Sequence, residues 1–309
     1  MRAILIHRVL VAAGVAVAVV AASSSARAED LPLLPLGSVA RPVPLDDDDT
    51  AKMRGCTDKP LPLLKDRLPF GPGELLSFDV ALLGIRTGKV NLRVGERTVS
   101  DGVTAYALQA EARSDTFLEV LGDFDARVVS FFDPTTLLPV RMVNHVVAHQ
   151  PFVTVPIDSR EESAFAKGNI NARVARTSKD GTVDKRAHLQ SNADVVDLLS
   201  VVYYLRSREL VEGAAVCFEL YHRRRLWHVE GTVGAIEVVN PPYGSKRGRR
   251  LDAIITRVGG KDPPPPRPVT AWIGDDADRL PLLVSTPDKL GNVEVRLLSL
   301  TRGRRLVAK

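Results

Sequence analysis

Hydrophobic and polar positions alternate along most of the chain after residue 70. In the first such run, Phe78, Val80 and Leu82 alternate with the polar residues Ser77 and Asp79. Alternation buries one face of a segment and exposes the other, which is typical of strands in an antiparallel sheet. The pattern therefore predicts a mainly β protein built on one large curved antiparallel sheet, as a half-barrel, a barrel or a sandwich. The same period recurs at 89–94, 106–111, 126–132, 139–149, 170–178, 184–190, 215–222, 225–239, 251–258, 268–273 and 292–298.

One segment has a helical period instead. Within residues 193–209 the apolar side chains of Val195, Leu199 and Val202 return at intervals of four and three, and Gly213 follows the end of the run. This spacing predicts one long amphipathic helix at 193–209. We expect its apolar face to cover the open side of the sheet.

The N-terminus has the pattern of an export signal. Arg2 and Arg8 are followed by an apolar stretch at 9–22 and by an Ala26-x-Ala28 site that suits signal peptidase. The apolar stretch is shorter than the ~20 residues of a membrane-spanning helix. We expect a signal peptide that is cleaved after Ala28 and a periplasmic or secreted protein with no transmembrane segment after cleavage. An uncleaved membrane anchor is the alternative.

The remaining chain divides by composition. Seven prolines and an acidic run at 46–49 mark residues 29–69 as an irregular, Pro-rich tail. A β-rich domain is expected at 70–300, and a basic C-terminal tail at 301–309. Residues 1–28, which precede the tail, are the predicted signal peptide.

Net charge gives little support for a nucleic-acid partner. The whole chain carries a formal charge of +5. Three of its arginines lie in the signal peptide, which has no acidic residue, so the mature chain is close to +2 (39 Lys and Arg against 37 Asp and Glu). Because the charges are also well mixed, we expect them to serve solubility and predict no nucleic-acid binding.

The chain has two cysteines, Cys56 and Cys217. An even count in an exported protein favours a disulfide. Cys217 lies on the more polar face of the strand-like run 215–222, where the irregular tail that contains Cys56 could reach it. Two free thiols are the alternative.

Two basic clusters are candidate anion-binding sites. The first is expected in a hairpin turn, and the second follows Asn240-Pro241-Pro242 and is expected in a mobile loop. A solvated loop is the leading interpretation of the second cluster. If the clusters bind a partner, it would in an exported protein be anionic lipid headgroups, lipopolysaccharide phosphates or acidic glycans rather than nucleic acid. The clusters consist of Arg223, Arg224, Arg225, Lys246, Arg247, Arg249 and Arg250.

No motif predicts a catalytic residue, a cofactor site or a metal site. The sequence lacks a Gly-x-Ser-x-Gly elbow, a His-Glu-x-x-His pair and a phosphate-binding glycine loop. His222 and His228 flank the first basic cluster and could meet across its turn, but zinc would need further ligands. A glycan hydrolase would need two facing carboxylates, for which only Glu74, Asp275 and Asp276 are candidates.

Three blocks of sequence resemble a bacterial exported family, domain of unknown function 3108, over roughly residues 69–300. The resemblance is carried by the segments 70–88, 197–206 and 272–295, which occur in the family's order. It implies a secreted β-rich domain without an assigned activity. The motif positions are Gly73, Glu74, Gly88, Asp197, Ser200, Tyr204, Arg206, Trp272, Asp276 and Pro281.

The motif positions are spread over turns and one helix, which favours a structural role for them over catalysis. The main hypothesis is a cell-envelope protein that binds a lipid, lipopolysaccharide or a partner protein without catalysing a reaction. A hydrolase of an envelope glycan or polymer is one alternative. A scaffold of an envelope assembly that docks through its Pro-rich tail is another.

Overall fold

The computed structural model describes most of the chain beyond residue 67. The predicted signal peptide, the acidic run and most of the Pro-rich tail lie outside the described residues. Those residues are 56, 61–64, 68–115, 123–149, 155–166, 168–191, 193–259, 263–288 and 291–306.

The described residues form fifteen strands and one short helix, α2 (Ser200–Arg206). The strands are β1 (Leu75–Leu82), β2 (Ile85–Ser100), β3 (Val103–Ser114), β4 (Phe124–Phe132), β5 (Pro139–Ala148), β6 (Ile157–Ala166), β7 (Asn169–Ser178), β8 (Gly181–Gln190), β9 (Val195–Asp197), β10 (Ala215–His222), β11 (Arg225–Val239), β12 (Lys246–Arg257), β13 (Arg267–Gly274), β14 (Pro281–Asp288) and β15 (Gly291–Thr301).

All fifteen strands belong to one sheet. Its order is β8-β7-β6-β5-β4-β3-β2-β1-β15-β14-β13-β12-β11-β10-β9, so the first and last strands, β1 and β15, pair in the middle of the sheet. Every described pairing is antiparallel except that of β9 with β10. Because β8 and β9 are at opposite ends of this order and do not pair, the sheet is not closed into a barrel. The predicted mainly β fold is confirmed, but the sheet is mixed rather than purely antiparallel.

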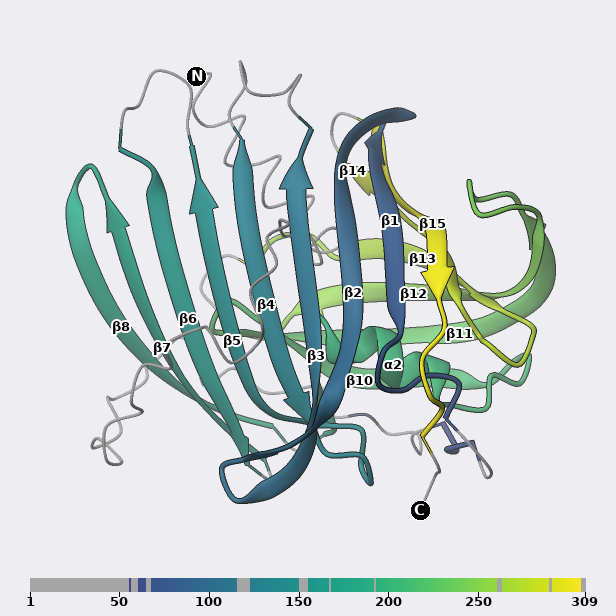
Figure 1. Cartoon of the computed structure of the whole chain (residues 1–309), viewed down its shortest axis with the longest axis horizontal. Coiled ribbons are helices and arrows are strands. Elements are labelled where there is room, and N and C mark those ends of the chain that lie inside the picture. Colours follow the sequence, from purple (N-terminus) through teal and green to yellow (C-terminus); the bar gives the residue numbers. More distant parts are fainter. Residues whose placement is uncertain are drawn as a thin grey trace.

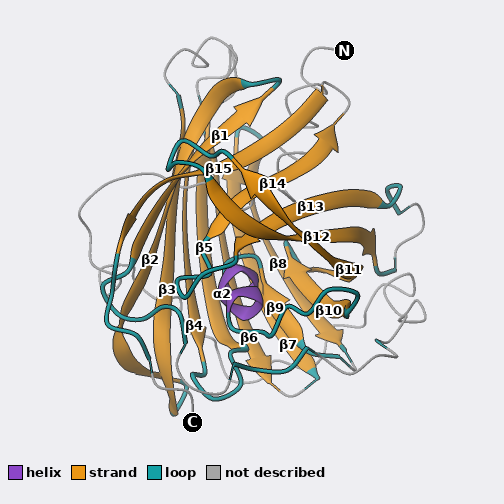
Figure 2. Ribbon diagram, turned by 90° about the vertical axis from the view of Figure 1, so that its right-hand side faces the viewer, coloured by secondary structure: helices purple, strands orange, loops and turns teal. Residues whose placement is uncertain are grey.

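The curved sheet makes two walls that cross each other. Strands β2–β8 run upright in Figure 1, and β10–β13 run across behind them. Helix α2 lies between the two walls in the turned view of Figure 2. Its Tyr203 belongs to the larger hydrophobic core cluster, which includes residues of β1–β5, whereas the next residue, Tyr204, belongs to the cluster formed with β10–β13. The helix therefore packs against both walls.

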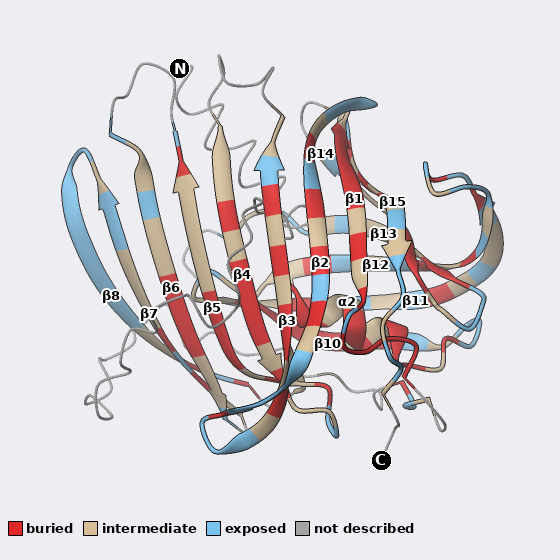
Figure 3. Cartoon of the chain, in the orientation of Figure 1, coloured by how far each residue is buried: buried red, intermediate tan, exposed pale blue. Residues whose placement is uncertain are grey.

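Alternation along each strand builds these cores. On β2, Val90, Leu92 and Val94 are buried, while Lys89 and Arg93 are exposed. Figure 3 shows the resulting bands of buried and less buried residues along β1–β5. Each buried face contributes favourable free energy in proportion to the apolar area that it removes from water.

The prediction of a long helix at 193–209 is wrong, since α2 has only seven residues. The apolar residues before it pair in parallel with β10 as strand β9. The Asp197 side chain accepts hydrogen bonds from the N–H groups of Leu199 and Ser200, at 2.8 Å each, and so starts the helix. The Ser207 hydroxyl donates to the carbonyls of the last turn and ends it. Among the described residues, no helix is long and apolar enough to span a bilayer.

Two flanking segments lie along the domain. Residues 61–64 run beside 207–209, where Leu64 N–H donates to the Ser207 carbonyl at 2.9 Å. Residues 304–306 run beside 68–72 through three backbone hydrogen bonds of 2.9–3.0 Å. Residues 61–64 and 304–306 are thus attached to the domain by backbone hydrogen bonds.

Candidate functional site

Motif residues from distant parts of the chain meet at one buried ion pair. Glu74 precedes β1 and Arg206 ends α2, and their side chains are 3% and 0% exposed. The guanidinium nitrogens Nη1 and Nη2 donate to Oε1 and Oε2 of Glu74 at 2.6 and 2.9 Å. This two-pronged geometry is the strong form of an Arg–carboxylate contact.

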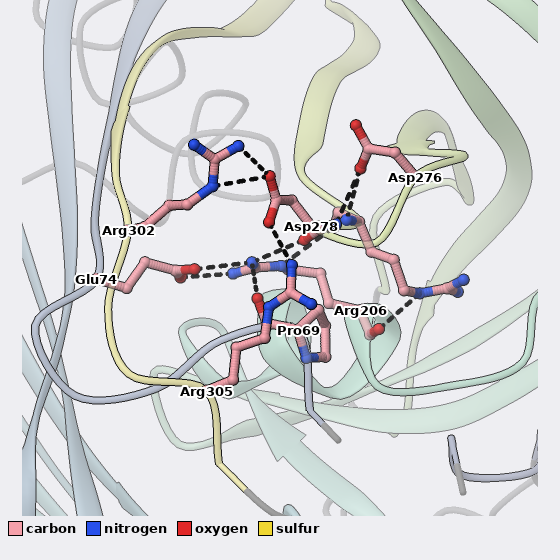
Figure 4. Close-up of polar contacts among 8 residues, drawn as sticks. Pro69, Glu74, Arg206, Asp276, Asp278, Arg302 and Arg305 are labelled. Atoms are coloured by element: carbon pink, nitrogen blue, oxygen red, sulfur yellow. Dashed lines mark hydrogen bonds and ion pairs between the residues drawn. The ribbon is translucent and has the colours of Figure 1, made fainter. Parts of the chain in front are cut away.

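The other contacts of Arg206 attach further segments to the same point. Its Nε donates to the carbonyl of Arg279 at 3.1 Å, and Nη2 donates to the carbonyls of Asp278 and Pro69 at 3.0 and 3.3 Å (Figure 4). The guanidinium also lies 5.3 Å from the ring centroids of Phe70 and Tyr203. Arg206 therefore joins α2, the start of β1 and the β13–β14 turn.

The β13–β14 turn is held from both sides. Asp276 accepts hydrogen bonds from the N–H groups of Asp278 and Arg279 at 3.1 and 3.0 Å. The Asp278 carboxylate accepts hydrogen bonds from Arg302 and Arg305, and the Arg302 contact is the main reason that its pKa lies below the usual range (Figure 4). Because these groups are occupied by each other, the cluster is a structural lock rather than a ligand site.

Two motif glycines shape strand connections. Gly73 has a φ of +89° at the turn that leads into β1. Gly88 lies at a bulge in the β1–β2 pairing, and a Cβ there would be 2.6 Å from the Arg113 carbonyl oxygen. A side chain at either position would strain the backbone or collide with it.

The aromatic motif residues also make contacts within the protein. Tyr204 packs against Phe218, with Arg208 lying 4.0 Å above its ring centroid. Trp272 on β13 donates its indole N–H to Glu237 at 2.8 Å. Pro281 is the first residue of β14. The Tyr204–Phe218 contact connects α2 to β10, and the Trp272–Glu237 contact connects β13 to β11.

Asp197 is a buried carboxyl group, and it connects the start of α2 to strand β4. The Ser130 hydroxyl on β4 donates to it, and Asp197 has no exposed surface. Burial raises the pKa of Asp197 above its usual range, because removing the carboxylate from water outweighs its hydrogen bonds. The Ser200 hydroxyl makes a further contact, because it accepts a hydrogen bond from the backbone N–H of Asp197 at 2.9 Å.

The raised pKa of Asp197 predicts a pH-dependent stability. Between the unfolded pKa of ~4 and the higher folded pKa, the folded state binds more protons than the unfolded state. The free energy of unfolding should therefore fall as pH rises through this window, and the Asp197→Asn variant should lack this contribution. Urea unfolding of both proteins from acidic to neutral pH measures the difference. A difference that does not change with pH would contradict the prediction.

A groove with a volume of about 540 Å³ lies on β10–β13. Small residues from three strands line it: Ala215 on β10, Gly231 on β11 and Ala253 on β12. Gly231 is required here, because a Cβ would lie 2.2 Å from the Asp252 carbonyl oxygen. The close approach of β11 and β12 thus depends on this glycine.

Substituting Gly231 should separate these two strands. We expect Gly231→Ala to lower the free energy of unfolding by about 1–3 kcal/mol, as overpacking does. Gly234→Ala on the same strand is the matched control, since a Cβ there would meet its nearest atom at an ordinary 3.4 Å. Denaturant unfolding of the two variants compares them; equal losses would show that Gly231 is not under this constraint.

The groove combines polar and apolar groups. Its carboxylates are Glu230 and Asp252, and the Thr270 hydroxyl donates to Asp252 at 2.8 Å. Ile254 and Val269 supply apolar surface, and Ile254 is 45% exposed. A hydrogen bond from Arg250 is the main cause of a lowered pKa at Asp252, which favours its charged form. The groove is therefore acidic, with apolar patches.

A disulfide between Cys56 and Cys217 lies at this groove, which confirms the predicted bond. Next to it, His228 Nε2 is 4.0 Å from Cys217 Sγ and 3.5 Å from Glu230 Oε2. The other ring nitrogen, Nδ1, lies 2.9 Å from Glu219 Oε1. Burial is the main cause of the raised pKa of Glu219.

The sequence did not predict that His228 and Glu219 would meet. They are directly opposite in the β10–β11 pairing, whereas His222 is opposite Arg225. Opposite residues share a face and successive residues alternate, so His222 and His228 are on opposite faces of the hairpin. Counting back from the two-residue turn would have revealed the Glu219–His228 pair.

The second basic cluster is not in a mobile loop, which corrects that prediction. Lys246 to Arg250 begin strand β12; residues 246–249 pair with β11, and Arg250 pairs with Trp272 on β13. Asp275 lies 3.4 Å from Arg247, Glu212 lies 3.2 Å from Arg249, and Arg250 contacts Asp252 at 2.7 Å. These five residues are basic or glycine and do not alternate between apolar and polar, so the sequence did not indicate that they begin a strand.

The first basic cluster is at the predicted hairpin turn. Arg223 and Arg224 have φ values of 48° and 59° and connect β10 to β11, which begins at Arg225. The Arg224 N–H donates to Glu161 on β6 at 3.3 Å. This turn therefore lies against the opposite wall.

The carboxylates considered for glycan hydrolysis have other contacts. Glu74 binds Arg206, Asp275 pairs with Arg247, and Asp276 accepts the backbone bonds of its turn. Each of these three carboxylates therefore already has a partner within the protein. No specific observation favours the hydrolase hypothesis.

The fold and these sites define an open, disulfide-linked β-sheet domain with a groove on one wall. The chain belongs to the family described as Protein of unknown function (DUF3108), whose model matches residues 77–298. This match confirms the resemblance seen in the sequence. No curated protein matches the chain.

Several solved structures are similar in fold. A β-barrel-like protein of domain of unknown function DUF1849 from Brucella abortus is 11% identical, with 74% of this chain and 97% of that chain covered and a TM-score of 0.46. A presumed exported protein with a YmcC-like fold from Bacteroides fragilis and a presumed lipoprotein from Parabacteroides distasonis are each 9% identical. Both matches cover 77% of this chain and 100% of the other, with TM-scores of 0.32 and 0.33.

Proposed function

We propose that the protein is exported, loses its signal peptide after Ala28, and works in the cell envelope as a binding protein without catalytic activity. Its partner would be another envelope protein, a segment of which occupies the groove on β10–β13. The groove carries this proposal because it is hollowed, partly apolar and accessible on the domain surface. Its volume of about 540 Å³ lies within the usual range for binding sites.

The chemistry of the groove suits a peptide segment. Apolar side chains of the partner would cover Ile254 and Val269, and its N–H, hydroxyl or basic groups would meet the carboxylates of Glu230 and Asp252. Burying the exposed part of Ile254 would contribute favourable free energy, while the polar contacts would set the orientation. The partner segment is therefore expected to be neutral or basic.

The same chemistry disfavours the anionic partners that were considered. Because Asp252 is already paired with Arg250, the repulsion of lipid or lipopolysaccharide phosphates in this groove would come mainly from Glu230. The basic residues Arg247, Arg249 and Arg250 already have acidic neighbours. Between the walls, α2 and its two tyrosines occupy space that a lipid would need.

A site-specific crosslink tests the proposal. A photoreactive amino acid would replace Thr232, an exposed groove residue, in the protein expressed in its own envelope. The matched control would carry it at Val99 on β2, which is 70% exposed. We expect one discrete protein adduct from position 232 and none from position 99. Mass spectrometry would identify the adduct, and binding would then be measured with the purified partner.

A pair of charge substitutions sharpens this test. Ile254→Asp places a charge in the groove, whereas Val238→Asp places one at a 66% exposed site on β11 that does not line it. The first should reduce the adduct and weaken binding to the purified partner by at least about tenfold, the cost of ~1.4 kcal/mol. Equal adducts from positions 232 and 99, or a lipid retained in native mass spectrometry and displaced by Ile254→Asp, would overturn the proposal.

A further inference from the structure

We propose that Cys56, Cys217 and His228 form a site for Zn²⁺ when their disulfide is reduced, with Glu230 as the fourth ligand. One ligand atom from each of the first three residues lies within 4.8 Å of the others. Two thiolates, an imidazole and a carboxylate are all groups that zinc binds in tetrahedral sites. This inference concerns the reduced chain and does not depend on the groove's binding a partner protein.

The distances need only a small rearrangement. His228 Nε2 is 4.0 Å from Cys217 Sγ, and Glu230 Oε2 is 3.5 Å from the same nitrogen. Tetrahedral Zn–S bonds of ~2.3 Å place two sulfurs about 3.7 Å apart. The two cysteine Cα atoms are 5.6 Å apart, so rotation of the side chains can provide this separation without moving the strand.

A buried carboxylate already orients the histidine. Glu219, 1% exposed, lies 2.9 Å from Nδ1 and directs Nε2 toward the sulfur and Glu230. Carboxylates in this position commonly fix the tautomer and orientation of zinc-binding histidines. The second oxygen of Glu219 is buried without a hydrogen-bond partner among the described residues. Cys217, His228 and Glu230 also line the groove, which offers a path for the ion.

The two states of the cysteines exclude each other. A dithiol reductant would supply two electrons and two protons to the disulfide, giving two thiols and the reductant's own disulfide. Zn²⁺ would then displace the two thiol protons and bind the thiolates. The disulfide form cannot supply those thiolates. The site would therefore serve the reduced chain, before oxidation in the envelope closes the disulfide.

Cobalt provides a direct readout of this geometry. The mature chain, without a histidine tag, would be reduced with a phosphine, which takes oxygen from water as it forms its oxide, and titrated with Co²⁺ under argon. We expect one equivalent to give thiolate-to-cobalt charge-transfer and tetrahedral d–d bands, and Zn²⁺ to abolish both. The oxidised protein should give neither. Absence of these bands in the reduced protein, or their persistence in Cys217→Ser, would overturn the proposal.

Variants separate a built site from free thiols. Glu219→Gln should lower zinc affinity ~10- to 100-fold, as loss of such outer carboxylates does, and His228→Gln should lower it at least as far. The control is His188→Gln, whose ring bonds to Asn171 on the β7–β8 hairpin. Circular dichroism would follow folding in each case, and Zn²⁺ should raise the melting temperature of the reduced wild type. Zinc affinity that is equal in all three variants would show binding by unstructured thiols and would overturn the proposal.

Discussion

Replacing Arg206 with alanine should lower the free energy of unfolding by about 3–5 kcal/mol. The change leaves the Glu74 carboxylate buried without its cation, and it removes the donors to the carbonyls of Pro69, Asp278 and Arg279. Uncompensated buried charges and unpaired carbonyls both destabilise a folded protein. Lysine should not restore the loss, because one ammonium group cannot reproduce the planar set of contacts. Urea unfolding of the oxidised protein measures the effect.

A second Arg–Glu pair in the same protein provides the control. Arg304 lies 2.9 Å from Glu96, but their side chains are 79% and 72% exposed. Exposed pairs contribute little, so Arg304→Ala should cost no more than ~1 kcal/mol. Similar losses in the two variants would show that Arg206 does not hold the domain together in the way its contacts indicate.

Removing the disulfide should also have a large effect. Cys56 and Cys217 are separated by 161 positions, so their bond closes a long loop in the unfolded chain. The chain-entropy relation predicts a stabilisation of about 5 kcal/mol for such a loop, and measured losses are typically about 2–5 kcal/mol. We therefore expect Cys56→Ser/Cys217→Ser to unfold at a clearly lower denaturant concentration than the oxidised wild type.

Reduction offers an independent check of the disulfide effect. With a chelator present to exclude metal, a phosphine reductant should lower the stability of the wild type by a similar amount and leave the double variant unchanged. A variant as stable as the oxidised wild type would contradict the prediction. Adding Zn²⁺ to the reduced wild type afterwards would connect this experiment to the proposed metal site.

These two attachments have different consequences for function. The Arg206 lock joins α2 to β1 and the β13–β14 turn, so it supports the arrangement of both walls. The disulfide connects the N-terminal segment to β10 beside the groove. Loss of the Arg206 contacts should therefore destabilise the whole domain. Loss of the disulfide should lower stability and, in addition, change the surroundings of the groove.

The strands were largely predictable because most of them have one buried face and one solvent-exposed face. The period of two identified β2 from Val90, Leu92 and Val94, which are buried as expected. The prediction of secondary structure failed where one continuous apolar pattern covers both a strand and a helix. Residues 193–209 read as one helix, but their first part pairs with β10 and only Ser200–Arg206 is helical. A short helix between two walls takes its stability from packing rather than from its own length.

The candidate sites were predictable only in part. The even cysteine count, together with the expected export signal, favoured the disulfide, and the motif residues included both members of the Glu74–Arg206 pair. The pair itself could not be predicted, because its members are 132 positions apart and meet only through the fold. The groove could not be predicted for the same reason. Neighbouring strands form it, and hydrophobic–polar alternation specifies neither the order of these strands nor their register.

The sequence by itself determined the class of fold, the family, the expectation of an export signal and the fact that the two cysteines could pair with each other. These follow from local chemistry: residue periodicity, short motifs and a count of thiols. Only the tertiary structure decided which charges are buried, which basic residues are already paired, and that His228, Glu219 and Glu230 surround the disulfide. Such contacts depend on strand register and on the crossing of two walls, and a one-residue shift in register would turn each side chain to the other face.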